Sequence, residues 1–267
     1  MTKNIISKFI LTGLLTIISV GINAQCNIDN RHFQSGEVLS YDLYFKYGIL
    51  HTKAGNASLT VANTKYRSKD AYRLRLTARS SGIAKSLYSL NDTLISYTTK
   101  GLVPLAYTKD AHEKGDYATE RATYDYSSGK VKMHTINSKN GNLRYDTTLV
   151  ADKCMYDVLS IVYYARTLDY SSMAPGDKKT VPFWSGRTKV DMDIEYHGIE
   201  SVSANDGREY NCIKLVLMMN DKAFENKNEA MRVYLTDDLN HIPVRIDSKL
   251  KVGSTRVILN GYKGLRN

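Results

Sequence analysis

The sequence has few of the residues that mark disulfide-rich, proline-rich or repeat-built modules. Its 267 residues include three cysteines, four prolines and one tryptophan. An odd number of cysteines excludes a fully paired disulfide framework, and so few prolines argue against a proline-rich binding module. Beyond an N-terminal apolar segment, no run is long enough to predict a membrane-spanning helix.

Catalytic and metal-binding signatures are also missing from the sequence. There is no G-x-S-x-G nucleophile elbow, no H-E-x-x-H zinc motif and no glycine-rich phosphate loop. The six histidines are scattered, and no Cys/His cluster has the spacing of a zinc site. The sequence therefore predicts no cofactor and favours a non-catalytic role over an enzyme.

Charge is abundant but not concentrated in one stretch. Lysine and arginine total 37 against 27 aspartates and glutamates, and the two signs alternate along most of the chain. A nucleic-acid-binding protein usually carries a basic stripe with a recognisable motif, so we expect no nucleic-acid partner. A cationic surface suits anionic lipid or polysaccharide, although simple solubility explains the same charge.

Residues 1–24 have the pattern of a cleaved signal peptide. Lys3 and Lys8 provide a positive start, and an apolar stretch follows that is too short to span a bilayer comfortably. We expect cleavage after Ala24 and a periplasmic or secreted protein with net charge 37 − 2 − 27 = +8. An uncleaved anchor and lipid attachment at Cys26 are the alternatives, and Gln25 fits the lipidation pattern poorly.

The 20 tyrosines and a two-residue periodicity indicate a mainly β protein. The clearest strand is 72–79, in which apolar residues alternate with arginine and threonine. Asn140-Gly141 predicts a two-residue hairpin turn, because both residues tolerate positive φ. We expect a single domain over 25–267 in which a curved antiparallel meander forms a barrel, half-barrel or two-sheet sandwich. The predicted strands are 36–45, 57–61, 72–79, 93–99, 105–109, 117–126, 130–138, 143–150, 178–184, 188–198, 209–219, 231–236, 244–251 and 255–261.

One helix is predicted, over about 152–168, at the centre of the fold. Its apolar residues recur at helical spacing: Met155, Val158, Leu159, Val162 and Tyr163. Asp152 is the expected N-terminal cap, and Arg166 lies near the last turn, where a cation complements the helix dipole. Residues 80–90 predict a short helical turn or a loop over the barrel mouth.

Several short motifs are spread along the mature chain: Gly36-Glu37, Asp157-Val-Leu-Ser160, Tyr163-Tyr-Ala-Arg166, Tyr210-Asn-Cys-Ile213, Thr236-Asp237-Asp238, Ile242-Pro243-Val244 and Gly253. They resemble landmarks of one exported bacterial family, known as domain of unknown function 3108. The resemblance covers most of the mature chain and implies an envelope protein in which a helix lies against a curved antiparallel sheet. It supplies no catalytic residues.

Two of the three cysteines have alternative states. Cys154 opens the predicted helix and Cys212 lies in an apolar strand, so a bridge between them is geometrically feasible. We favour instead two buried free thiols, since unpaired cysteine behaves as a small hydrophobic residue.

The best polar cluster is the run 190–197. Asp191, Asp193, Glu195 and His197 alternate with apolar residues and share one face of a strand. Such carboxylates could bind a cation such as calcium or perform acid–base chemistry. We favour a solvent-exposed face with basic neighbours.

The candidate ligand-binding residues are Asp157, Tyr163, Arg166, Trp184 and Tyr210. The two charged residues could clamp a ligand beside the helix, but we favour anchoring of the helix to the sheet through charge-assisted hydrogen bonds. The aromatic residues could line an apolar or sugar-stacking cavity, although plain core packing is the commoner role.

We therefore predict a periplasmic binding or carrier-like protein whose β-sheet cavity holds an apolar or glycan ligand. The candidate partners are a lipid, a glycan or an envelope protein. An envelope polysaccharide hydrolase that uses Asp191 and Asp193 is one alternative. A structural partner in an envelope complex, marked by an exposed apolar patch, is the other.

Overall fold

The computed structural model describes residues 26–267 except 48–49, 88, 220–228 and 251–252. The predicted signal peptide, residues 1–24, and the cleavage site after Ala24 lie outside the described residues. No helix in the described part of the chain has the length and apolar character needed to cross a membrane.

The described strands form one sheet of 15 strands in the order β8-β7-β6-β5-β4-β3-β2-β1-β15-β14-β13-β12-β11-β10-β9. All neighbours pair antiparallel except β9 and β10. The strands are β1 Val38–Tyr47, β2 Leu50–Tyr66, β3 Lys69–Ser80, β4 Leu90–Thr98, β5 Pro104–Glu113, β6 Asp116–Asp125, β7 Val131–Lys139, β8 Asn142–Ala151, β9 Tyr156–Asp157, β10 Lys178–Ser185, β11 Thr188–Ser203, β12 Glu209–Met219, β13 Met231–Thr236, β14 Pro243–Lys249 and β15 Ser254–Lys263.

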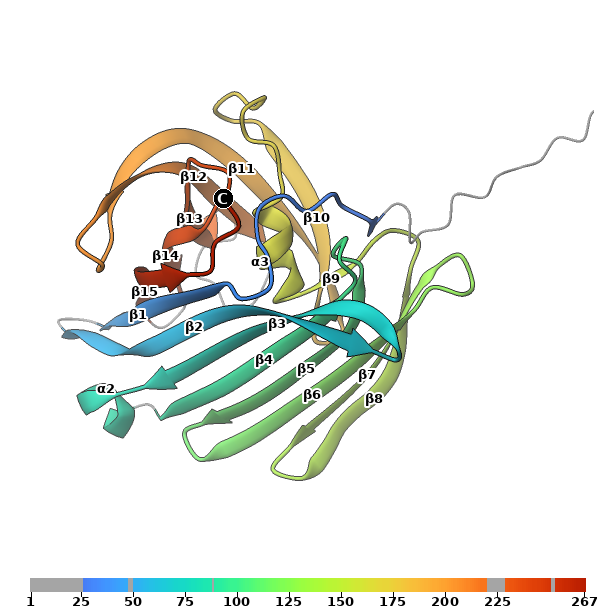
Figure 1. Ribbon diagram of the computed structural model, residues 1–267. Helices are drawn as coiled ribbons and strands as arrows, with labels where there is room; N and C mark the ends of the chain where they lie inside the picture. The colour runs from blue at the N-terminus through green and yellow to red at the C-terminus, as the bar shows by residue number, and fades with distance from the viewer. Residues whose placement is uncertain (1–25, 48–49, 88, 220–228, 251–252) are drawn as a thin grey trace, which may run out of the picture.

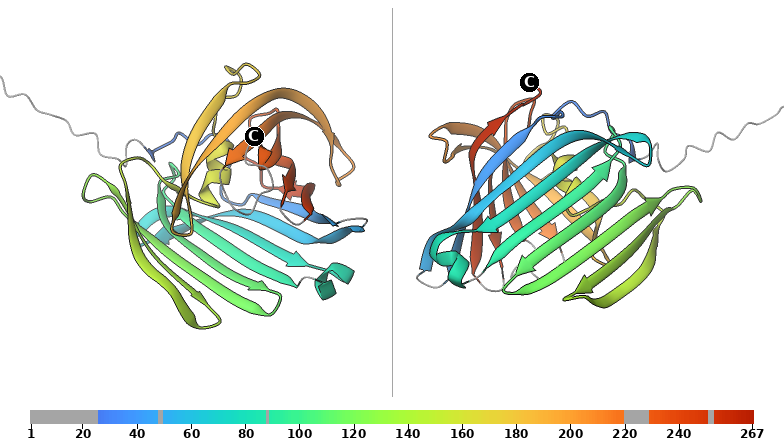
Figure 2. Two further views of the ribbon diagram at one scale, coloured as in Figure 1. Left: turned by 180° about the vertical axis from the view of Figure 1, so that it is seen from behind. Right: turned by 60° about the horizontal axis from the view of Figure 1, so that its bottom comes forward.

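The sheet curves into a barrel-like shell that does not close. Its two edges are β8 and β9, and β1 pairs with both β2 and β15 in the middle. We call β1–β8 the N-terminal half and β9–β15 the C-terminal half. Figures 1 and 2 show the two halves curving around the short helix α3, Ser160–Ala165. The predicted fold class, a curved antiparallel meander around one central helix, is confirmed.

Alternation of side chains gives the sheet an inner face, which curves around α3, and an outer face. In β3, Tyr72 and Leu74 are buried while Arg73 and Arg75 are exposed, as the periodicity predicts. In the C-terminal half, Leu217 pairs with both Ile194 and Met231 across the ladders. The inner face is therefore continuous from strand to strand.

The predicted turns are present where the chain reverses. Asn140 and Gly141 join β7 to β8, with φ angles of +53° and +79°. Asparagine and glycine adopt such positive φ angles at little energetic cost. Residues 82–87 form a short helix, α2, between β3 and β4. The predicted helical turn in this region is confirmed.

The predicted bounds of the central helix, 152–168, are wrong. The helix α3 covers only Ser160–Ala165, and Tyr156–Asp157 form the short strand β9 instead. Asp152 does not cap it, since its side chain is exposed and pairs with Lys130 at 3.0 Å. The chain cannot be helical at 156–157, because those residues pair with β10.

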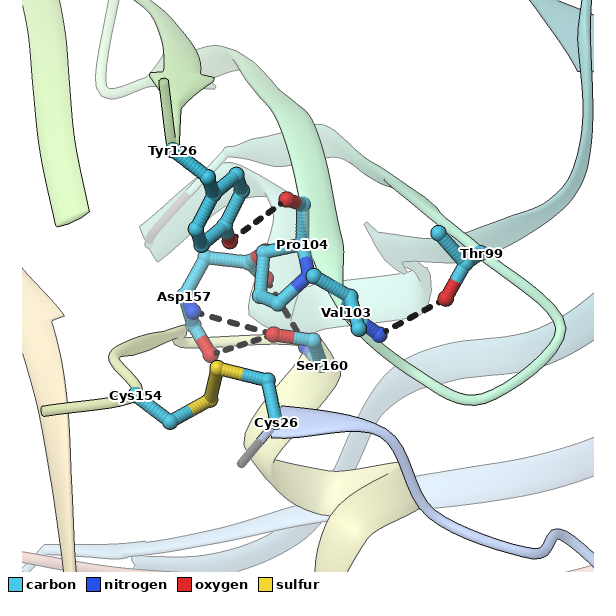
Figure 3. The surroundings of a disulfide bond; sticks show 8 residues. All are labelled: Cys26, Thr99, Val103, Pro104, Tyr126, Cys154, Asp157 and Ser160. Atoms are coloured by element: carbon cyan, nitrogen blue, oxygen red, sulfur yellow. Dashed lines mark hydrogen bonds between the residues drawn. A yellow bond between two sulfur atoms is a disulfide. The ribbon is translucent and has the colours of Figure 1, made fainter. Parts of the chain in front are cut away.

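The predicted states of the cysteines also need correction. Cys26 and Cys154 form a disulfide (Figure 3). Cys212 is a buried free thiol. The bridge between Cys154 and Cys212 is therefore absent, and Cys154 is not a free thiol. The sulfur of Cys26 is used in the disulfide, so in this state it cannot also carry a lipid.

Two apolar cores meet at α3. The first packs the inner face of the N-terminal half, and Leu159 and Tyr163 belong to it. The second packs the inner face of the C-terminal half, and it includes Ile161. The helix therefore separates two compartments inside the shell.

Candidate functional site: a cavity between α3 and the C-terminal half

Asp157 fixes the start of α3. Its carboxylate accepts hydrogen bonds from the backbone N–H groups of Leu159 at 3.0 Å and Ser160 at 2.8 Å, and from the hydroxyl of Ser96 in β4 at 2.7 Å. Figure 3 shows Asp157 and Ser160 turned toward one another. Burial raises the pKa of the Asp157 carboxyl, and the hydrogen bonds from both serines act in the opposite direction.

Arg166 fixes the end of α3. Its guanidinium donates two hydrogen bonds to the Glu37 carboxylate, at 2.6 and 2.8 Å, and one to the carbonyl oxygen of Asn240 at 2.9 Å. The side chains of Arg166 and Glu37 are both 0% exposed. A buried arginine needs such a bidentate partner, because an unpaired charge would carry a large desolvation cost.

These contacts tie the helix to the sheet and to a loop between its strands. Asp157 reaches β4, and Arg166 reaches the residue before β1 and the loop before β14. The described contacts therefore support the anchoring role that we favoured for both residues. Their predicted role in ligand binding stays a prediction.

A cavity of about 390 Å³ lies beside the opposite face of α3. The helix side contributes Val158, Ile161, Val162 and Ala165. Their spacing of three, four and seven residues places them along one face of a helical turn. All four side chains are small or aliphatic, so this face of α3 leaves space where an aromatic residue would fill it.

The sheet side of the cavity is the inner face of β10–β14. Met192, Leu215 and Leu217 are buried there, and Ser185 is the one polar residue among the described lining residues. The cavity volume is within the range of small-molecule sites, which are mostly apolar with few polar groups. The sheet residues that line it are Phe183, Ser185, Met192, Leu215, Leu217, Met219, Met231, Val233, Leu235, Pro243 and Ile246.

The three predicted aromatic site residues lie elsewhere. Tyr163 packs in the first core, with its ring 4.9 Å from that of Phe33. Trp184 is buried in the same core, and its Nε1 has no hydrogen-bond partner among the described residues. The Tyr210 hydroxyl donates to Asp206 at 2.6 Å. None of the five predicted ligand-binding residues lines the cavity.

Sequence reasoning missed the cavity although its helix stripe already included two of the lining residues. That stripe correctly places Leu159 and Tyr163 in the first core, but Val158 and Val162 from the same stripe line the cavity, together with Ile161 and Ala165. The available signal was side-chain size, because none of these four lining residues is aromatic.

The carboxylates of β11 lie on the outer face. Asp191 is 3.8 Å from Lys189, Asp193 accepts a hydrogen bond from Thr180 at 2.6 Å, and Glu195 pairs with Lys178 at 2.9 Å. No group of three or more metal-ligating side chains gathers anywhere in the described chain. The row has the basic and polar neighbours expected of a solvent-facing strand.

The inner face of the N-terminal half carries a second, polar region. Asp92, Glu113, Lys109 and Glu120 lie there on β4–β6, as the strand registers show. Burial, followed by the nearby charge of Glu113, raises the pKa of Asp92 to about 6. Burial likewise raises the pKa of Glu120. We call these four residues the polar wall.

One open, curved sheet that encloses a short helix and an apolar cavity defines a β-barrel-like protein. The sequence matches the family described as "Protein of unknown function (DUF3108)" over residues 40–260. The chain belongs to this DUF3108 family. No curated protein matches it.

A solved structure with a TM-score above 0.5 supports the fold. A β-barrel-like protein of the DUF1849 domain from Brucella abortus superposes with a TM-score of 0.60 at 9% identity, covering 88% of this chain and 99% of that one. A Bacteroides fragilis protein, described as a "putative exported protein with YmcC-like fold", gives a TM-score of only 0.34 at 12% identity. The match covers 87% of this chain and 97% of that one. The DUF1849 likeness shows the fold alone.

Proposed function

We propose that this protein is an exported binding or carrier protein that holds an apolar ligand in the cavity between α3 and β10–β14. The observation that carries the proposal is the lining, which is apolar except for Ser185 in a cavity of about 390 Å³. An unfilled space of this size costs stability, because its lining atoms lose packing contacts. A ligand that occupied it would restore those contacts.

The disulfide supports export. Disulfides persist in oxidising compartments and are rare in the cytosol, and Cys26 and Cys154 are paired. Cys26 also follows closely on the predicted cleavage position after Ala24, and its disulfide joins it to Cys154, just before β9. Both observations agree with a periplasmic or secreted protein.

The composition of the lining favours an apolar ligand over a glycan. A sugar needs several hydrogen-bonding groups, because burying its hydroxyls unpaired is costly. Ser185 alone does not meet that need within the described lining. The hydrolase alternative gains no comparable support, since the β11 carboxylates lie on the outer face and pair with neighbours. The structural-partner alternative needs an exposed apolar patch, whereas large exposed apolar side chains such as Leu143 in β8 and Ile199 in β11 lie on separate strands.

The test is binding of the fluorescent apolar probe N-phenyl-1-naphthylamine to the purified mature protein. We expect saturable fluorescence enhancement with wild type. Ile161→Phe, which fills the cavity from the helix side, should weaken binding about tenfold or more. Ala165→Leu adds three carbon atoms to the same wall, as Ile161→Phe does, and should act in the same direction.

Ile199→Phe is the matched control, because Ile199 is 50% exposed on β11 and does not line the cavity. It should bind the probe as wild type does. Equal affinity in wild type and in both filled variants, with thermal unfolding unchanged, would refute the proposed site. Native mass spectrometry of protein purified from the periplasm of the producing cells should then show no apolar adduct either.

A further inference from the structure

The cavity is longer in the direction across the strands than in the direction along them. Its lining reaches from Ser185 in β10 to Ile246 in β14, over five neighbouring strands. Four strand spacings of about 4.8 Å give a length of about 19 Å. Along β12 the lining covers only Leu215 to Met219, or roughly 13 Å. The ligand is therefore expected to be elongated.

Volume and length together define the size of the ligand. A cavity of about 390 Å³ holds roughly 13 groups, if each takes about the 30 Å³ of a water molecule. An extended hydrocarbon chain advances about 1.3 Å per carbon, given bonds of about 1.5 Å at tetrahedral angles, so 19 Å corresponds to about 15 carbons. The volume and the length of the cavity both fit a single hydrocarbon chain of moderate length. Neither is large enough to enclose a two-chain lipid completely.

The lining suits a flexible chain. Met192, Met219 and Met231 contribute thioether side chains to the wall, and methionine adapts to irregular apolar shapes. Neither tyrosine of α3 lines the cavity, because Tyr163 packs in the first core and the ring of Tyr164 lies 4.7 Å from that of Tyr156. A rigid planar ligand would find no stacking surface on the helix side.

One end of the cavity is closed by protein. Ala165, Leu235 and Pro243 line this end, and the Pro243 carbonyl accepts a hydrogen bond from Tyr41 at 3.0 Å. The next residue after Ala165 is Arg166, whose guanidinium is held by Glu37. These polar groups are satisfied within the protein, so this end offers only apolar contacts to a ligand.

The other end is polar. Ser185 ends β10, and the exposed Arg187 follows in the turn, with its guanidinium 5.5 Å from the centre of the Tyr145 ring in β8. No ion pair to Arg187 is found in the described part of the chain. The acidic residue Glu120 also lies near Tyr145.

We propose that the ligand is a single acyl chain of about 12 to 16 carbons with an anionic head at the Ser185–Arg187 end and its methyl end at Ala165 and Pro243. This proposal rests on the proposed function, since it specifies the occupant of the same cavity. A free fatty acid and a single-chain phospholipid share this chemistry.

The first experiment is displacement of N-phenyl-1-naphthylamine by saturated fatty acids of 8, 10, 12, 14, 16, 18 and 20 carbons, with cholesterol as a rigid apolar competitor. We expect the strongest competition at 12 to 16 carbons and weak competition by cholesterol. Probe binding without any chain-length optimum, or with cholesterol as the best competitor, overturns this inference and leaves the proposed function standing. Failure of the probe itself to bind overturns both.

The second experiment tests the position of the head. Arg187→Ala should weaken tetradecanoate binding about fivefold at low salt, as expected for one exposed charge pair, and leave tetradecanol binding unchanged. Arg208→Ala is the matched control, because Arg208 is also exposed and lies 5.7 Å from the Tyr262 ring. An equal effect of Arg187→Ala on acid and alcohol, or none on either, refutes the assigned orientation.

A lysophosphatidylglycerol with one 14-carbon chain distinguishes the two sources of the ligand. Stronger competition by this lipid than by tetradecanoate identifies a phospholipid head, and the reverse order identifies a fatty acid. Competition by neither, with the probe bound, counts against the acyl-chain class.

Discussion

The two halves of the shell share one continuous sheet, but their inner faces differ in chemistry. In the N-terminal half, the inner face combines an aromatic core around Phe33 and Tyr72 with the polar wall. In the C-terminal half, leucine, methionine, isoleucine and valine predominate, and the cavity remains between them and α3. The same strand periodicity thus supports an aromatic and polar inner face in one half and an apolar inner face beside a cavity in the other.

Side-chain size on α3 accounts for the difference. Leu159 and Tyr163 fill the space toward the N-terminal half, while Ile161 and Ala165 leave space toward the C-terminal half. The position of the helix is fixed at both ends by Asp157 and Arg166. Because the helix cannot shift to close the gap, the cavity persists as part of the fold.

The largest expected effect concerns the ion pair at the boundary of the two halves. Glu37→Gln should lower the free energy of unfolding by about 3–5 kcal/mol, because it leaves the buried Arg166 charge without its partner. Urea denaturation of the mature protein measures this loss. Glu200→Gln breaks the partly exposed pair with Lys214 and should cost less than about 1 kcal/mol.

An equal cost for the two variants would contradict the picture of a sealed boundary. It would mean that water reaches Arg166 in solution, so that the closed end of the cavity is open. The difference between Glu37→Gln and Glu200→Gln is therefore the quantity to compare, with both proteins measured at the same pH and salt concentration.

A matched pair of truncations tests whether one half is filled and the other hollow. Leu74→Ala in the N-terminal half removes a side chain that is 0% exposed in the first core, and should cost about 3 kcal/mol. Leu217→Ala removes one that already faces the cavity, and should cost about 1–2 kcal/mol, because fewer contacts are lost. Thermal and urea unfolding of the two variants give these values. A greater loss for Leu217→Ala would show that the C-terminal half is packed in solution.

The strands could be predicted from sequence because one face of most of them is buried and the other is wet. The alternation in 72–79 and the turn at Asn140-Gly141 are both confirmed. The bounds of the helix could not be predicted from sequence, because the apolar spacing of 152–168 fits one long helix as well as it fits a short strand, a loop and a shorter helix. The pairing of residues 156–157 with β10 decides the matter, and that pairing brings together segments that are distant in sequence.

The candidate site was less predictable for a related reason. Glu37 and Arg166 were both recognised as landmarks, but their contact joins residues 129 positions apart. The disulfide joins residues 128 positions apart, so neither partner could be chosen from local spacing. The cavity is an absence of side-chain volume between α3 and five strands, and only the assembled fold shows which small residues face one another.

The smallest expected effect is a pH dependence that belongs to the polar wall. The pKa of Asp92 is raised to about 6 by burial and by Glu113, against about 3.9 in an unfolded chain. The folded state therefore binds the proton more tightly, and this contribution to stability is complete below about pH 4 and is lost as the pH rises through about 6. Asp92→Asn removes the charge and should stabilise the protein by about 1–2 kcal/mol at pH 8, after allowance for solvent screening, and by much less at pH 4.

Urea unfolding at pH 4, 6 and 8 measures this difference, and Asp191→Asn is the control, because Asp191 is exposed on the outer face of the C-terminal half. Asp92→Asn keeps an oxygen that can accept the hydrogen bond from the backbone N–H of His112, and its amide N–H can donate to Glu113 in place of the carboxylic acid proton. If Asp92→Asn and Asp191→Asn gave the same profile, the inner face of the N-terminal half would be as well solvated as the outer surface. The proposed difference between the two inner faces would then be contradicted for the N-terminal half, because ionising the polar wall would cost no more than ionising a surface residue.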